Sequence, residues 1–161
     1  MILDADALNR ISQSKLGSKF FLERKFKTWI TPHSKEFQRL FPDIKGENNV
    51  GLALKAAKEF NISVLLKGAN STIANNKKAW QICGTDSQTA RAGLGDLLSG
   101  FLAGSSAIDL RFYRNITTEF FAKYTLLHSY AAFKCKTGSN AHDIGYELSK
   151  LMRNRKTRQI S

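Results

Sequence analysis

The chain has 161 residues, 42% of them hydrophobic and 24% charged, a size and balance that suit one globular domain with its own core and exclude a largely disordered chain. Lys and Arg number 25 against 13 Asp and Glu, so the formal net charge of +12 allows an anionic partner such as a phosphorylated small molecule or a nucleic acid. The longest apolar stretches are too short to cross a bilayer, and the two cysteines, which form no CxxC pattern, indicate neither a disulfide framework nor a structural zinc site.

The charge pattern favours a small-molecule ligand over nucleic acid. Basic residues concentrate at positions 15–27 and 150–158, which we interpret as a solvated face and a helix end that leads into a tail. A nucleic-acid module would interleave basic residues with exposed aromatics or contain a recognition helix, and neither pattern occurs. Met1 is followed directly by Ile2 rather than by a basic targeting segment, so we expect a cytoplasmic protein with no membrane partner.

The first part of the sequence alternates short strands with helices. The segment 27–31 is predicted to be a strand, because β-branched and aromatic residues run into Pro32, which a helix would not tolerate. Ser34 is expected to cap a short helix through its side chain. In chain order we predict strand 2–4, a helix to about residue 12, strand 27–31, helix 34–41, helix 48–60 with Val50, Leu54, Ala57 and Phe60 on one face, and buried strand 62–66.

The second part begins with a hairpin and then becomes helical. Residues 71–74 and 79–82 are predicted to pair across a turn at Asn75-Asn76. Helices are expected near 96–107, 116–136 and 141–153. This order predicts an α/β fold on a largely parallel sheet, with residues 1–161 forming a single domain.

The strongest chemical signal is Gly93-Leu94-Gly95-Asp96. Two glycines before a helix let the backbone approach a ligand, and the helix start directs unpaired amides at phosphate oxygens. Gly93, Leu94 and Gly95 are therefore a candidate anion hole. Asp96 is a candidate catalytic base that takes a proton from a hydroxyl as it attacks a phosphoryl group. On the motif alone, a glycine turn with an aspartate at the helix start is about as good an interpretation.

Four further segments accompany this motif: Leu-Asp-Ala-Asp-Ala-Leu-Asn at 3–9, Ile-Thr-Pro-His-Ser-Lys-Glu-Phe at 30–37, Val-Leu-Leu-Lys-Gly-Ala-Asn-Ser-Thr-Ile at 64–73, and Leu-Leu-His-Ser-Tyr-Ala-Ala at 126–132. With them the chain resembles the carbohydrate kinase domain of the ADP/ATP-dependent NAD(P)H-hydrate dehydratases, in the ribokinase-like superfamily. The resemblance implies a three-layer α/β/α sandwich. It also implies an enzyme, a lyase, in which ADP or ATP with Mg²⁺ phosphorylates the hydroxyl of hydrated NADH or NADPH, and loss of phosphate regenerates the cofactor.

The same resemblance implies roles for individual residues. It puts His33 and Asp96 at the substrate and Glu36 at Mg²⁺ through water. The residues that it implies for nucleotide binding are Lys67, Gly68, Ala69, Asn70, Ser71 and Gly95. It further suggests an epimerase domain or subunit as a partner, and we expect a homo-oligomer.

Several of these residues also have ordinary structural interpretations. Lys67 could be a surface charge at a strand end, and first-turn helix stabilisation by Glu36 is as good an expectation as metal binding. Seen without the family, His33 would be a helix cap or a solvated residue. Asp4 and Asp6 are interpreted as a turn and helix cap rather than as a metal pair, and His128 as a packed helix residue.

Two departures from the family qualify the resemblance. Residues 84–91 lack its Asn-Pro-Gly-Met sequence, and Arg91 replaces a smaller residue. The family domain begins upstream of residue 3, so we expect the chain to correspond to the C-terminal part of the domain, without the N-terminal strands, and its activity alone stays open. A vitamin or sugar kinase, which commonly has Asn in place of His33, and a catalytically silent basic binding module are the alternative functions.

Overall fold

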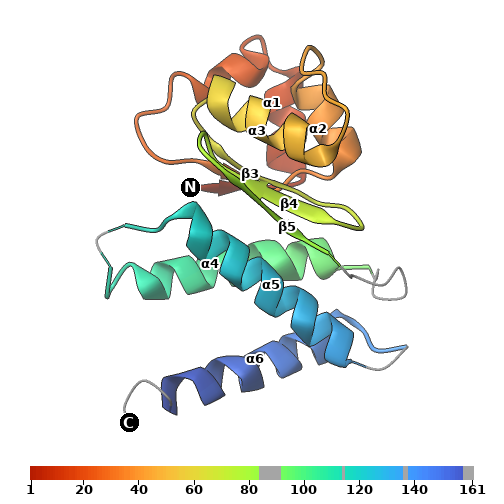
Figure 1. Cartoon of the computed structure of the whole chain (residues 1–161), viewed down its shortest axis with the longest axis vertical. Coiled ribbons are helices and arrows are strands. Elements are labelled where there is room, and N and C mark those ends of the chain that lie inside the picture. Colours follow the sequence, from red (N-terminus) through yellow and green to blue (C-terminus); the bar gives the residue numbers. More distant parts are fainter. Residues whose placement is uncertain (84–91, 114, 136–137, 158–161) are drawn as a thin grey trace. The chain divides into compact units, whose positions relative to one another are not determined.

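The computed structural model describes residues 1–83, 92–113, 115–135 and 138–157, the last four by their backbone alone (Figure 1). The chain separates into two compact units, Met1–Gly84 and Thr85–Ser161. Strands and helices alternate in the first unit, and the described part of the second unit is helical. The predicted α/β class is therefore confirmed.

The first unit contains all of the predicted strands and helices, and most of them are one to three residues shorter than predicted. The 3₁₀ helix η1 was not predicted from the sequence. The elements in order are β1 (Ile2–Leu3), α1 (Asp6–Gln13), η1 (Gly17–Phe21), β2 (Trp29–Ile30), α2 (Ser34–Leu40), α3 (Asn49–Glu59), β3 (Ser63–Leu66), β4 (Ser71–Ala74) and β5 (Ala79–Ile82).

The five strands form one sheet in the order β1-β2-β3-β4-β5. β1, β2 and β3 are parallel, with Leu3 opposite Ile30 and Ile30 opposite Val64. β4 pairs antiparallel with both β3 and β5, so β4 alone among the described strands runs against the others. The predictions of a largely parallel sheet and of a β4–β5 hairpin are confirmed.

Helices α1, α2 and α3 cover one face of this sheet (Figure 1), and aromatic residues fill the space beneath them. The Phe41 ring contacts three others, with centroids 6.0 Å from Phe21, 5.0 Å from Phe37 and 4.9 Å from Phe60. Such ring pairs add to the free energy gained from burying their apolar surface. The core thus holds the helices that support β1–β3.

Helix α3 packs through small residues rather than through its larger apolar ones. Ala53, Ala56 and Ala57 are fully buried, whereas Val50 and Leu54, which we expected on the buried face with Ala57, are only half-buried. Alanine lets the helix axis approach its neighbours closely. The expected face is therefore confirmed at Ala57 and Phe60, while Ala53 and Ala56, which were not predicted, take the most buried positions.

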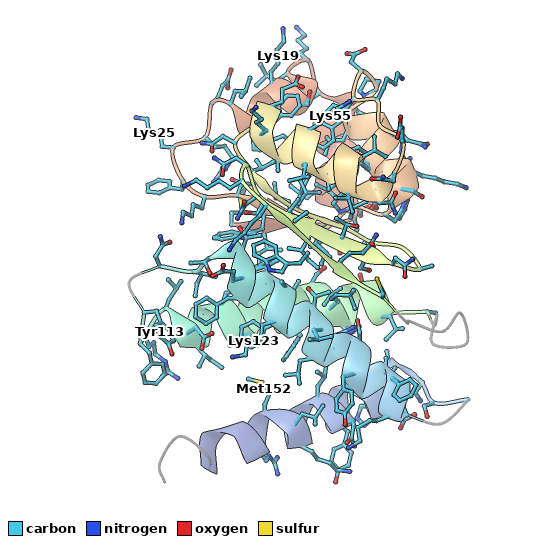
Figure 2. All side chains as sticks on the ribbon, viewed as in Figure 1. Lys19, Lys25, Lys55, Tyr113, Lys123 and Met152 are labelled. Atoms are coloured by element: carbon cyan, nitrogen blue, oxygen red, sulfur yellow. The ribbon has the colours of Figure 1, made fainter. Side chains whose placement is uncertain are left out.

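The second unit contains three helices in its described residues, as predicted: α4 (Leu94–Asp109), α5 (Thr118–Lys134) and α6 (Ala141–Thr157). Ala131, Ala132, Ile144 and Leu148 form a buried cluster in this unit. No described helix is both long and apolar enough to span a membrane. Figure 2 shows the side chains of both units, and the labelled Lys19, Lys25 and Lys55 are exposed, as expected for solvated charges.

Two non-glycine residues in the described part of the first unit, Ala5 and Asn61, have positive φ, and of these Ala5 has the side chain less suited to it. Ala5 has φ 46° and ψ −116° in the turn between β1 and α1, and this turn is closed by a hydrogen bond of 3.1 Å from Ala7 N to Asp4 O. Positive φ in a residue with a Cβ atom is strained by about 1–3 kcal/mol. The first turn of α1 therefore forms against a local conformational preference.

We expect Ala5→Gly to raise the free energy of unfolding by about 1 kcal/mol, because relief of the strain exceeds the added entropy of the unfolded chain. Urea denaturation followed by circular dichroism measures the change. The matched control is Ala7→Gly, two residues on in the first turn of α1, which should lower stability by up to about 1 kcal/mol. Equal destabilisation by both substitutions would contradict strain at Ala5.

His128 is a buried residue of α5, as predicted, and not an exposed ligand. Its side chain is 6% exposed, and its Nε2 has no hydrogen-bond partner among the described residues. Burial lowers the pKa of His128 from 6.5 to about 4, because the charged imidazolium loses its hydration.

This shift predicts a pH dependence of stability. Above pH 6.5 His128 is neutral in both the folded and the unfolded chain, and it causes no loss of stability. As the pH falls from 6.5 to about 4, the unfolded chain protonates His128 while the folded chain does not, so the free energy of unfolding decreases across this window. We expect His128→Leu to reduce that loss, which we estimate at on the order of 3 kcal/mol. Urea titrations at the two ends of the window measure it. An unchanged slope in the variant would show that other groups cause the acid sensitivity.

Candidate functional site

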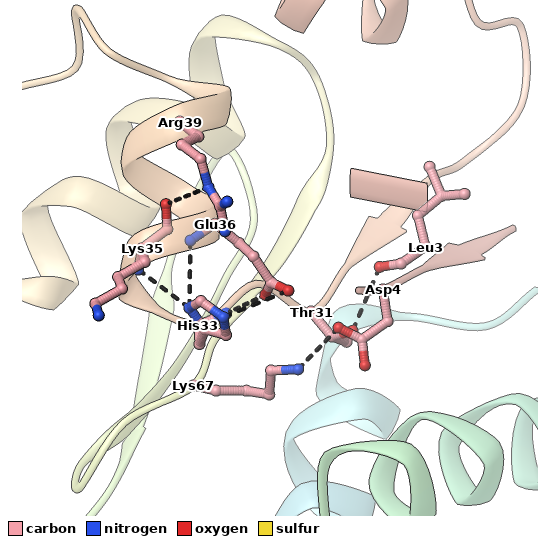
Figure 3. Close-up of polar contacts among 8 residues, drawn as sticks. All are labelled: Leu3, Asp4, Thr31, His33, Lys35, Glu36, Arg39 and Lys67. Atoms are coloured by element: carbon pink, nitrogen blue, oxygen red, sulfur yellow. Dashed lines mark hydrogen bonds and ion pairs between the residues drawn. The ribbon is translucent and has the colours of Figure 1, made fainter. Parts of the chain in front are cut away.

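The carboxyl ends of β1, β2 and β3 bring polar side chains together in the first unit (Figure 3). Asp4 follows β1 directly and Lys67 follows β3, while His33 lies just beyond β2 and is paired in register with Lys67. The backbone continues the sheet here, with Thr31 N donating to Leu3 O at 3.0 Å and Lys67 N donating to Pro32 O at 2.8 Å. In open α/β sheets this edge is where ligands bind.

His33 and Glu36 form a capping box at the start of α2. The His33 Nδ1 accepts hydrogen bonds from Lys35 N at 3.1 Å and from Glu36 N at 3.2 Å. In return, Glu36 Oε2 accepts one from His33 N at 2.8 Å. The helix cap is thus His33, one of the two roles that the sequence without the family gave this residue. The expectation that Ser34 caps the helix was wrong, because the imidazole ring reaches the free amides from one position earlier.

The capping box determines what His33 can offer a ligand. Since Nδ1 accepts two backbone hydrogen bonds, Nε2 is the ring nitrogen left to act as a donor. Nε2 lies 3.5 Å from Glu36 Oε1, and 47% of the His33 side chain is exposed. The half-exposed His33 ring therefore has Nε2 as its remaining donor, which suits binding of a carbonyl or hydroxyl oxygen better than removal of a proton.

Glu36 is 6% exposed, and both of its carboxylate oxygens face His33. Of its two expected roles, stabilisation of the first helical turn is the one that these contacts provide. The described residues include no group of three or more His, Cys, Asp or Glu side chains suited to a metal ion. Metal binding by Glu36 through water remains a prediction.

Residues 67–71 form the tight connection between β3 and β4. Gly68, Ala69 and Asn70 are exposed, and the Ser71 hydroxyl donates to Gly68 O at 3.2 Å. The Gly68 amide donates to Ser71 Oγ at 3.4 Å, and the backbone of such an exposed turn can approach a phosphate group. Lys67 is only 21% exposed, and its Nζ lies 2.8 Å from Asp4 Oδ1, so it is a paired side chain rather than a freely solvated charge.

The ion pair between Asp4 and Lys67 was missed from the sequence. We expected Asp4 and Asp6 to provide a turn and a helix cap; the turn is present, but the residue at the cap position is Ala5 and no side chain caps α1. One signal could have revealed the pair. Each partner directly follows a strand, and the carboxyl ends of the parallel strands of one sheet lie along the same edge.

In the second unit, Gly93 begins α4 in the left-handed conformation, with φ 80° and ψ −6°. A Cβ atom there would lie 3.4 Å from the Cβ of Ala141. Leu94 and Gly95 are the first helical residues, so their amides point out of the helix end, where Gly93 has no side chain to cap them. Arg91, named above as a departure from the family, lies outside the described residues.

Asp96 lies in the first turn of α4 and is exposed. It borders a groove of about 570 Å³ between α4 and α6, which is lined mainly by apolar or small residues such as Gly100, Gly104 and Leu148. A carboxylate at this position is reachable by a ligand held at the helix start. The candidate residues thus form two groups, one in each unit.

A family profile described as NAD(P)H-hydrate dehydratase, of the carbohydrate kinase type, matches residues 1–152. The bifunctional NAD(P)H-hydrate repair enzyme Nnr of Corynebacterium glutamicum is 31% identical over 158 residues, covering 92% of this chain and 27% of that protein. The ADP-dependent (S)-NAD(P)H-hydrate dehydratase of Nitrosopumilus maritimus is 38% identical over 78 residues, covering 47% of this chain and 27% of that protein. The chain spans about a quarter of these relatives.

Solved structures show the same fold. A ribokinase-like superfamily protein of Enterococcus faecalis matches 95% of this chain and 52% of its own, with a TM-score of 0.74 and 23% identity. The ADP/ATP-dependent NAD(P)H-hydrate dehydratase of Bacillus subtilis, co-crystallised with ATP and Mg²⁺, matches 95% of this chain and 54% of its own, with a TM-score of 0.69 and 20% identity. The predicted ribokinase-like fold is confirmed, over about half the length of these structures.

The capping box predicts how substitutions of His33 affect stability. His33→Ala should lower the free energy of unfolding by about 1 kcal/mol, because the cap is lost and two amides lose their acceptor. His33→Asn should stay close to the unsubstituted chain, since its Oδ1 can replace Nδ1. Asn48→Ala, which removes the 2.9 Å bond from Gly51 N that caps α3, is the matched control in urea denaturation. If His33→Ala is as stable as the unsubstituted chain, the capping box contributes nothing.

Proposed function

Because the chain belongs to the carbohydrate kinase family of NAD(P)H-hydrate dehydratases, we propose that it carries the nucleotide-binding and base-bearing part of a dehydratase that repairs hydrated NADH or NADPH. The observation that carries the proposal is the family match over residues 1–152, within which the Gly93–Asp96 turn forms the start of a helix open to an anion. The co-substrate is ADP or ATP.

Two features support binding of the nucleotide. The start of α4 offers the amides of Leu94 and Gly95 with the positive end of the helix dipole, which suits phosphate oxygens. The 67–71 turn offers the exposed residues Gly68, Ala69 and Asn70 and the ammonium group of Lys67. The proposed nucleotide contacts are therefore Gly95 and residues 67–71, and the anion hole is formed by Gly93, Leu94 and Gly95.

Asp96 acts as the base in the proposed reaction. Its carboxylate takes the proton of the substrate hydroxyl as the hydroxyl oxygen attacks the terminal phosphorus and the bond to the leaving nucleotide breaks. Phosphate then departs with its C–O bonding electrons, and loss of a proton from the adjacent carbon restores the ring double bond. His33, oriented by the capping box, binds an oxygen of the substrate through its Nε2–H group.

Neither described carboxylate at this edge of the sheet is placed to bind Mg²⁺ directly, so we propose that phosphate oxygens and water would supply most of its ligands. Asp4 is paired with Lys67, and Glu36 is buried against His33, so neither is positioned as a direct ligand. Mg²⁺ commonly binds through few protein groups and several waters. When bound, it neutralises charge on the phosphates, and Glu36 is proposed to reach it through water.

The remaining parts of the proposal concern assembly. Nnr relatives are bifunctional by name, which supports an epimerase domain or subunit as a partner of this chain. We also propose that the two compact units function as one ribokinase-like domain in a cytoplasmic homo-oligomer. In this proposal, hydrate repair is carried out by the homo-oligomer together with its epimerase domain or subunit.

The test is repair of hydrated NADH by the protein purified as its gene encodes it, with Mg²⁺ and ADP or ATP, followed by the returning NADH absorbance. We expect Asp96→Asn to lower turnover by about 10²-fold or more while nucleotide affinity and thermal stability change little. Asp143→Asn, at the corresponding first-turn position of α6, is the matched control and should leave turnover unchanged.

Three outcomes decide the proposal. Absence of repair by the unsubstituted protein would reject the dehydratase function, and accumulation of a stable phosphorylated product would identify a small-molecule kinase instead. Full turnover by Asp96→Asn would reject Asp96 as the base.

A further inference from the structure

The first unit contains a partly buried ion pair between residues far apart in the sequence. Lys67 Nζ lies 2.8 Å from Asp4 Oδ1, and the two side chains are 21% and 12% exposed. The pair links the ends of β1 and β3 across β2 (Figure 3). The pair therefore joins Lys67, a proposed nucleotide contact, to Asp4, which has been described only as part of the turn between β1 and α1.

Backbone contacts hold both partners of this pair in place. Lys67 N donates to Pro32 O at 2.8 Å, which extends the parallel ladder past the end of β3. At the other end, Thr31 binds Leu3 O through both its N and its Oγ1, at 3.0 and 3.3 Å. Asp4 then enters the turn in which Ala5 has positive φ. The carboxylate is consequently supported from a rigid and locally strained backbone.

Pairing changes the state in which a lysine meets a ligand. An unpaired lysine at a strand end samples many rotamers, and ordering it on binding costs conformational entropy. Asp4 accepts from one of the three ammonium N–H groups and orders the side chain beforehand. Within the described residues, no other acceptor contacts this ammonium, so two N–H groups remain for an anion.

We propose that Asp4 is a positioning residue that orders the Lys67 ammonium toward a phosphate group of the nucleotide. This inference rests on the proposed nucleotide-dependent function. Two roles of Asp4 are possible, positioning Lys67 for phosphate or competing with phosphate for it, and they predict opposite changes in nucleotide affinity when Asp4 is removed. If Asp4 positions Lys67, its removal weakens phosphate binding, whereas if Asp4 competes with phosphate, its removal frees the positive charge and strengthens binding.

The experiment is calorimetric titration of ADP and of adenosine, which lacks phosphate, into the unsubstituted protein and its variants. We expect Asp4→Asn to weaken ADP binding about tenfold and to leave adenosine binding unchanged. Asp4→Glu should restore part of the affinity. In the Lys67→Met background, Asp4→Asn should have no further effect on ADP, because the group that it positions is absent.

Asp6→Asn is the matched control, since Asp6 is an exposed aspartate two residues away in the first turn of α1. It removes the same charge and should leave ADP affinity unchanged. Thermal unfolding of every variant reports whether the fold is intact. If Asp4→Asn does not fold, Asp4→Glu carries the same test with the charge retained, and the expected loss for ADP is then smaller.

The outcomes separate this inference from the function on which it rests. If the unsubstituted protein binds ADP and Asp4→Asn, or Asp4→Glu where Asp4→Asn does not fold, binds it equally or more tightly, Asp4 does not position Lys67, and the proposed function stands. An equal loss of adenosine and ADP affinity would show a merely structural role for Asp4 and would also overturn the inference. If the unsubstituted protein binds no ADP, the nucleotide-dependent function fails, and the inference fails with it.

Discussion

The parallel pairing of β1, β2 and β3 is the constraint on which the first half of the site depends. Its register places Leu3 opposite Ile30 and Ile30 opposite Val64, so the residues that follow the three strands emerge together. Backbone hydrogen bonds continue past the strand ends through Thr31 and Lys67. A shift of one residue in any strand would turn these side chains to the opposite face of the sheet. Packing of aromatic rings under α1–α3 holds that register.

Residues at this edge combine structural and chemical duties. His33 caps α2 with one ring nitrogen, and the same hydrogen bonds leave the other nitrogen as a donor. Glu36 completes the cap, and its burial beside His33 keeps the imidazole oriented. Ala5 adopts a strained conformation in the turn that supports Asp4. Because these residues stabilise the fold, a substitution that tests their proposed binding roles also changes stability, and the two effects have to be measured separately.

The order of elements and the candidate motifs could be predicted from the sequence because they depend on neighbouring residues. Pro32 ends β2, Asn75-Asn76 turns the hairpin, and glycine precedes α4, all through local backbone preferences. The left-handed φ of Gly93 agrees with the freedom expected of that motif. The resemblance to hydrate dehydratases rests on short segments in order, and the family match over residues 1–152 agrees with it.

Other features required the tertiary structure, because they depend on contacts between distant residues or on atoms whose reach differs by one position. Whether Ser34 or His33 caps α2 depends on side-chain rotamers, and periodicity predicted the burial of Ala57 but not that of Ala53 and Ala56. The partner of Lys67 is 63 residues away and becomes its neighbour only when three strands pair in parallel. The sequence by itself thus determined the elements and the candidate residues, whereas strand register and packing decided which side chains meet.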